Sequence, residues 1–130
     1  MTDVREQLTE LLVEEQRLVD LLAGLRRRQA AAIDRAGEAK DALADAAERV
    51  TAALRAAAVD PSPAAEKRLQ AAEKAADACA DPARHIREAE RLAEHIGVAE
   101  ADLRRLREDK QPVEQSHWRA LAAVLREELR

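Results

Sequence analysis

The sequence predicts an all-α fold, an antiparallel coiled-coil helical hairpin. Three observations lead to it: an alanine- and leucine-rich composition, a long 4-3 spacing of apolar residues, and prolines gathered at the candidate turns. The 130 residues include 31 alanines and 16 leucines but one Trp, no Phe or Tyr and three Gly, and 37 % are charged. This composition is typical of long helices and coiled coils. It lacks the β-branched and aromatic residues that a β-rich or α/β core needs.

The first element is one long helix, expected over about residues 3–58. Asp3 can cap its start, and no proline occurs before Pro61. Gly24 and Gly37 each disfavour a helix by about 1 kcal/mol, too little to interrupt so long a pattern. A 4-3 seam, which marks a coiled coil, is apolar at all but two positions: Val4, Leu8, Leu11, Glu15, Leu18, Leu22, Leu25, Gln29, Ala32, Ala36, Ala39, Leu43, Ala46, Val50, Ala53 and Ala57.

A turn over 59–62 is expected next, because Pro61 pushes the residue before it out of helical angles. Ser62 followed by Pro63 is a helix-start signal, and Asp81-Pro82 repeats it. Pro112 lacks a good cap before it and can mark a kink. These signals divide the return path into helices over 63–80, 82–111 and 113–130.

The returning segments carry their own seam, which keeps phase with the first. Paired residue numbers in an antiparallel hairpin have a nearly constant sum, and Leu18 with Leu103 and Leu25 with Ile96 both give 121. Cys79 falls opposite Leu43 in nearly the same register and is expected to be a small core residue. The whole chain, 1–130, is therefore predicted to form a single helical domain. The return seam consists of His85, Ala89, Leu92, Ile96, Ala99, Leu103 and Leu106.

The leucine-rich end, residues 4–25 with 113–130, carries more apolar side chains than one seam can cover. Such a surplus indicates an interface. Either Pro112 lets residues 113–130 fold back into a three-helix bundle, or this stripe pairs with another subunit. The candidate interface residues are Leu12, Val19, Leu21, Trp118, Leu121, Leu125 and Leu129.

Two basic clusters form a candidate collar for nucleic acid or an acidic partner. They consist of Arg26, Arg27 and Arg28 with Arg104, Arg105 and Arg107. Acidic residues surround them, the formal net charge is −4, and no aromatic residue stands nearby to stack on bases. A solvated, salt-bridged face is the favoured interpretation, and nucleic acid is not the expected partner.

The sequence carries no pattern that predicts catalysis. It has no glycine-rich phosphate loop, no nucleophile elbow and no zinc-spaced cysteines. Glu114 with His117 and His85 with Glu88 have metal-ligand spacing, but such matches arise by chance in an acidic helical chain. We expect no catalytic residue, no cofactor and no metal.

The expected location is the cytoplasm. Charged residues interrupt residues 1–25, which rules out a signal-peptide core there, and no apolar run is long enough for a membrane span. The single cysteine excludes an intramolecular disulfide and fits a reducing compartment.

The function expected from the sequence is therefore a non-enzymatic coiled-coil interaction, scaffold or adaptor protein. It would act through its leucine-rich end, by self-association, with a homodimer expected, or by partner capture. The alternative is a regulator whose collar contacts either nucleic acid or a separate enzyme that acts on nucleic acid.

Overall fold

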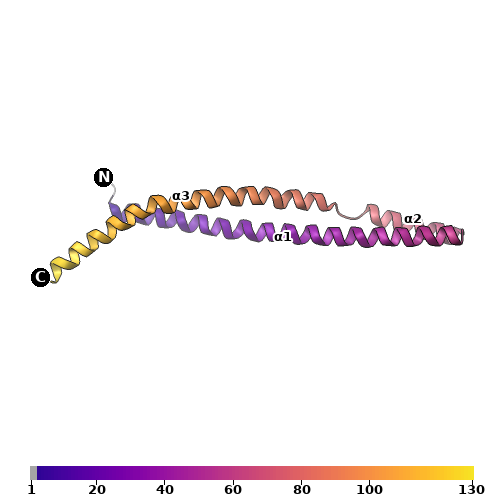
Figure 1. Cartoon of the computed structure of the whole chain (residues 1–130), viewed down its shortest axis with the longest axis horizontal. Coiled ribbons are helices and arrows are strands. Elements are labelled where there is room, and N and C mark those ends of the chain that lie inside the picture. Colours follow the sequence, from indigo (N-terminus) through magenta and orange to yellow (C-terminus); the bar gives the residue numbers. More distant parts are fainter. Residues whose placement is uncertain (1–2) are drawn as a thin grey trace. The chain divides into compact units, whose positions relative to one another are not determined.

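The computed structural model describes residues 3–130 as three helices, α1 (Val4–Val59), α2 (Pro63–Asp77) and α3 (Pro82–Glu128) (Figure 1). No strand occurs among these described residues. The chain is an all-α helical hairpin, so the predicted fold class is confirmed. The predicted first helix and the turn after it agree with the structure to within one residue, and neither Gly24 nor Gly37 interrupts α1.

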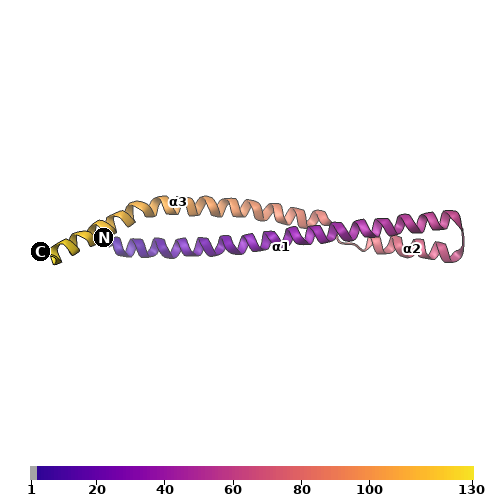
Figure 2. The same ribbon diagram turned by 60° about the horizontal axis from the view of Figure 1, so that its bottom comes forward.

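The described chain divides into two compact units. The terminal unit contains residues 3–27 and 92–130, and the turn unit contains residues 28–91. In the terminal unit the first part of α1 runs antiparallel to α3, and both views show α3 continuing past the start of α1 (Figures 1 and 2). The buried residues of this unit all belong to the predicted seams: Leu18, Leu22, Leu25, Leu92, Ile96, Ala99 and Leu103.

The turn unit has a core of small side chains. In it the second part of α1 pairs with α2 and with the first turns of α3 (Figure 2). The Cys79 thiol lies 3.8 Å from the carbonyl oxygen of Ala42, as the predicted register requires. Leu43 is the one seam residue of α1 that stays exposed, at 42 %. The buried residues are Ala32, Ala36, Ala39, Ala46 and Ala65.

The predicted helix-start residues Ser62 and Asp81 each accept a backbone hydrogen bond at the start of a helix. The Ser62 hydroxyl accepts a hydrogen bond from the Ala65 amide at 3.1 Å, and Pro63 occupies the first helical position of α2. The Asp81 carboxylate accepts from the Ala83 amide at 3.0 Å. Each cap satisfies a backbone donor that has no partner inside its helix.

Replacing Ser62 by alanine removes the cap of α2. We expect Ser62→Ala to lower the free energy of unfolding by about 1 kcal/mol, the usual effect of losing such a cap. Urea denaturation followed by circular dichroism measures the change. Ser116→Ala is the matched control, because Ser116 is an exposed residue inside α3 where alanine favours the helix. A Ser62→Ala midpoint equal to that of the control would contradict the capping role.

The return path differs from the prediction in two places. α2 ends at Asp77, three residues early, and α3 runs unbroken through Pro112 instead of dividing there. Proline removes one backbone donor, so the Glu108 carbonyl loses its partner four residues on. Both Glu108 and Pro112 are exposed, so water can satisfy that carbonyl. Residues 113–128 continue α3 and do not fold back, so the three-helix alternative is wrong.

Candidate interaction surfaces

The C-terminal part of α3 carries apolar side chains that remain exposed among residues 3–130. α1 begins at Val4, and α3 continues past that start (Figures 1 and 2). Trp118 is 59 % exposed and Leu125 is 50 % exposed. The exposed members of this surface, which we call the apolar tail, are Trp118, Leu121, Val124, Leu125 and Leu129.

The other three predicted interface residues are also exposed, but they do not share one surface. Leu12 and Val19 stand one helical repeat apart on one flank of the α1 seam, and Leu21 stands on the opposite flank. The prediction that these residues lie outside the hairpin core is consistent with their exposure. The structure brings neither Leu12 nor Leu21 against the apolar tail of the same chain.

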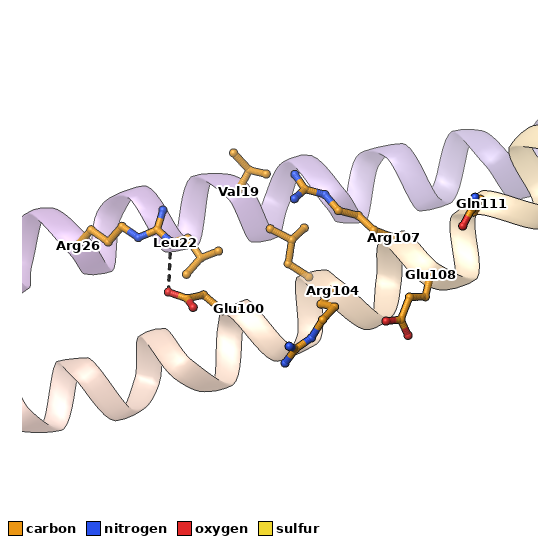
Figure 3. Close-up of a pocket in the computed structure, with 9 residues that line it drawn as sticks. Val19, Leu22, Arg26, Glu100, Arg104, Arg107, Glu108 and Gln111 are labelled. Carbon is orange, nitrogen blue, oxygen red and sulfur yellow. Dashed lines mark hydrogen bonds and ion pairs between the residues drawn. The ribbon is translucent and has the colours of Figure 1, made fainter.

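Val19 opens onto a groove between α1 and α3 in the terminal unit (Figure 3). Its floor contains Leu22 and Leu103, and charged side chains line its rim. Arg26 donates a hydrogen bond to Glu100 across the groove at 3.2 Å. In this view Arg104 extends away from α1. The groove combines an apolar floor with a rim that is already partly ion-paired.

A polar cluster interrupts the seam at Glu15. The Glu15 carboxylate accepts hydrogen bonds from Lys110 at 3.0 Å and from Arg107 at 3.0 Å. Lys110 also lies 3.8 Å from Glu114. Glu15 and Lys110 are only 18 % and 17 % exposed. Hydrogen bonding by Lys110, and next by Arg107, holds the pKa of Glu15 below its ordinary value of 4.5.

The sequence marked Glu15 only as a gap in the apolar seam and did not identify its partners. Lys110 belongs to α3 one turn beyond Leu106. One further step of the 4-3 spacing from Leu106 reaches Lys110, which lies inside the predicted helix over 82–111, so its place on the return seam could have been read from the sequence.

Half of the predicted collar is ion-paired. Arg26 pairs with Glu100, Arg105 lies 3.5 Å from Asp102, and Arg107 pairs with Glu15. No ion pair of Arg27, Arg28 or Arg104 occurs within residues 3–130. The three pairs agree with the favoured interpretation of a salt-bridged face for that half of the collar.

A different basic surface has no such neutralisation. Arg84, Arg87 and Arg91 stand at i, i+3 and i+7 near the start of α3, together with Glu88, around a shallow surface depression. All three arginines are exposed. No ion pair of these three arginines occurs in residues 3–130. This surface, which we call the basic stripe, does not stand out in the sequence, because no two of its arginines are adjacent.

The histidines form no metal site in the structure. Throughout residues 3–130, no group of three or more His, Cys, Asp or Glu side chains could hold a metal ion. His85 lies half-buried on the seam as predicted, and its Nδ1 is buried without a hydrogen-bond partner. His117 packs edge-on against Trp118, with ring centroids 5.8 Å apart.

Two further findings bear on function. Among the described helices, none is long and apolar enough to cross a membrane. Comparisons with protein-family models, curated proteins and solved structures find no match to this chain. Functional conclusions therefore depend on the surfaces described above.

Proposed function

We propose that this chain is a non-enzymatic coiled-coil interaction protein that self-associates through the apolar tail of α3. Capture of a helix from another protein by the same surface is the second form of this function. The main observation behind the proposal is that Trp118 and Leu125 are both exposed. They lie on the part of α3 that extends beyond the start of α1.

The shape of the apolar tail favours a helical partner. Trp118, Leu121 and Leu125 stand at i, i+3 and i+7, with the half-buried Ala122 at i+4, which is the spacing by which one helix presents a stripe to another; Val124 stands beside this stripe. Arg119, Arg126 and Glu127 stand away from this stripe. A tryptophan within an apolar patch is the residue type most enriched among interface hot spots.

The polar rim of the terminal unit supports an interaction role over the collar alternative. A collar that binds nucleic acid would need free cationic groups, and Arg26, Arg105 and Arg107 already have carboxylate partners. The collar therefore has less support than the apolar tail as a site of function.

Truncating the apolar tail is the direct test. We expect the wild-type chain to sediment at twice its 14.3 kDa mass at high concentration. Trp118→Ala with Leu125→Ala should weaken the dimer at least about 30-fold, because one lost hot spot typically removes 2 kcal/mol or more. Sedimentation equilibrium over a concentration series measures the dissociation constant, and circular dichroism checks that helix content survives.

The matched control is Leu54→Ala with Val98→Ala. These residues are as exposed as the tail residues but lie elsewhere on the helices, so the control should leave the dimer unchanged. A wild-type chain that stays monomeric contradicts self-association. Equal weakening by the control would show that the tail has no particular role.

A further inference from the structure

We infer that the basic stripe, Arg84, Arg87 and Arg91, is a binding surface for the phosphate backbone of duplex nucleic acid. This inference does not depend on the apolar tail, which belongs to the other unit of the chain. It also differs from the collar alternative, because none of the collar arginines belongs to the stripe.

The first observation behind this inference is that the guanidinium groups of the basic stripe are not ion-paired within the part of the chain that the structure describes. All three stripe arginines are without an ion pair within residues 3–130, whereas three of the six collar arginines, Arg26, Arg105 and Arg107, each have a carboxylate within 3.5 Å. An arginine without a partner can offer its planar donor fork to a phosphate in a bidentate contact. An arginine that is already paired must first give up its carboxylate.

The spacing of the stripe gives the second step. Seven residues of helix separate Arg84 from Arg91, which is about 10.5 Å at 1.5 Å per residue. Arg84, Arg87 and Arg91 therefore present three guanidinium groups along about 10.5 Å of one helix face, so a phosphate backbone lying against that face can meet more than one of them.

The surroundings favour a phosphate backbone over an acidic protein. The four residues that line the depression, Arg84, Arg87, Glu88 and Arg91, are all charged. A protein interface needs an apolar centre that excludes water, and the stripe offers none. A duplex backbone needs only cationic groups and binds through the release of its counterions.

The absence of aromatic side chains points to a duplex, not a single strand. Trp118, the one aromatic residue of the Phe, Tyr and Trp types, lies in the terminal unit. Single-strand binding uses aromatic platforms on which bases stack, and the stripe has none to offer. Contacts limited to the backbone carry no sequence information, so binding should be independent of sequence.

Carboxylates on the same helix limit the strength of this surface. Glu88 stands among the arginines, Glu90 and Glu94 stand at i+3 from Arg87 and Arg91, and Asp81 caps the helix one turn before them. Removing the Glu88 charge should therefore tighten binding. Asp81 is unsuitable for the same test, because its carboxylate holds the Ala83 amide.

The test is fluorescence anisotropy of a labelled random-sequence DNA duplex with the full-length chain at 50–200 mM salt, the range over which counterion release is strong. Three phosphate contacts should give a slope of about −2.7 for log K against log salt, so affinity falls about 40-fold across this range. Arg87→Gln should make the slope less negative by about 0.9. The triple change Arg84→Gln, Arg87→Gln and Arg91→Gln should abolish binding, and Glu88→Gln should strengthen it.

The matched control changes three collar arginines, Arg26→Gln, Arg104→Gln and Arg105→Gln, which should leave the affinity and slope as in the wild type. Three outcomes overturn the inference. The wild-type chain fails to bind the duplex at 50 mM salt, or the collar variant loses binding while the stripe variant keeps it. In the third, a poly-glutamate peptide binds the stripe more tightly than the duplex does, which identifies an acidic protein as its partner.

Discussion

Leu22→Ala is expected to remove about 2–5 kcal/mol from the free energy of unfolding, the largest effect of any single change proposed for this chain. Leu22 is 3 % exposed and lies in the terminal unit among Leu18, Leu25 and Leu103. Shortening a buried leucine loses its transfer free energy and leaves a cavity that its neighbours fill only in part. Domains of this size are stable by only about 5–15 kcal/mol.

Leu43→Ala provides a matched comparison, because Leu43 occupies the same 4-3 seam of α1 but is 42 % exposed. Its side chain is only partly covered, so truncation loses less apolar area and leaves no enclosed cavity, and alanine favours a helix slightly more than leucine. We expect a loss of about 1 kcal/mol, clearly smaller than at Leu22.

Urea denaturation at one fixed protein concentration compares the two variants, since self-association would make stability depend on concentration. Similar losses for Leu22→Ala and Leu43→Ala would mean that the seam is buried evenly along α1. That result would contradict the concentration of the leucine core in the terminal unit.

The fold was largely predictable because helix, seam and turn each depend on local sequence. The 4-3 spacing identifies which face of α1 is inside, and Ser62-Pro63 and Asp81-Pro82 mark where the next helices begin. The exposure of Leu43 was not predictable from spacing alone. Leu43 falls opposite Cys79, in the interval between the end of α2 at Asp77 and the start of α3 at Pro82, and this early end of α2 was not predicted.

At Pro112 the tertiary contacts of α3 outweigh the low helix propensity of proline. Proline disfavours a helix interior by about 3 kcal/mol in isolation, yet α3 continues through it. On the C-terminal side of Pro112, Val113, Glu114 and His117 remain partly buried. Lys110, two residues before the proline, is held by Glu15. These contacts lie on both sides of a helix that stays continuous although it bends in its C-terminal part (Figure 1), and no single-residue signal encodes them.

The sequence predicted that the chain has exposed apolar and basic surfaces, but it did not predict correctly which residues form the unpaired basic surface. The surplus of leucines indicated an exposed apolar region, and the structure leaves Trp118 and Leu125 uncovered. Adjacent arginines drew attention to the collar, although their neutralisation depends on Glu100 and Glu15, which are far away in sequence. The basic stripe has no adjacent arginines to mark it in the sequence. It is recognised only when residues spaced over two turns are placed on one face of a helix.

The second large effect is expected at the polar cluster around Glu15. Lys110→Met would leave the Glu15 carboxylate with Arg107 alone, in a site where Glu15 is only 18 % exposed. We expect a loss of about 1–2 kcal/mol, between the 0.2–1 kcal/mol of exposed pairs and the 3–5 kcal/mol of broken buried pairs. Replacing both partners, Glu15→Leu with Lys110→Leu, should be neutral or stabilising, because it completes the apolar seam.

The same cluster makes stability depend on pH in a defined direction. The pKa of Glu15 is lower in the folded chain than its ordinary 4.5, because Lys110 and Arg107 donate hydrogen bonds to the ionised form. Its stabilisation is therefore complete above about pH 4.5 and is lost as the pH falls through the lower folded pKa. Urea midpoints measured from neutral pH downward should show the gap between the wild type and Lys110→Met closing in acid.

Glu14→Gln is the control for this dependence. Glu14 pairs with Arg17 on the surface, where solvent screens the pair, so its removal should leave the neutral-pH midpoint unchanged. A gap between the wild type and Lys110→Met that persists unchanged in acid would show that Lys110 acts through the packing of its carbon chain. In that case apolar contacts of the Lys110 side chain stabilise the packing of α1 against α3 near Glu15, and the ionised Glu15 carboxylate contributes nothing to it.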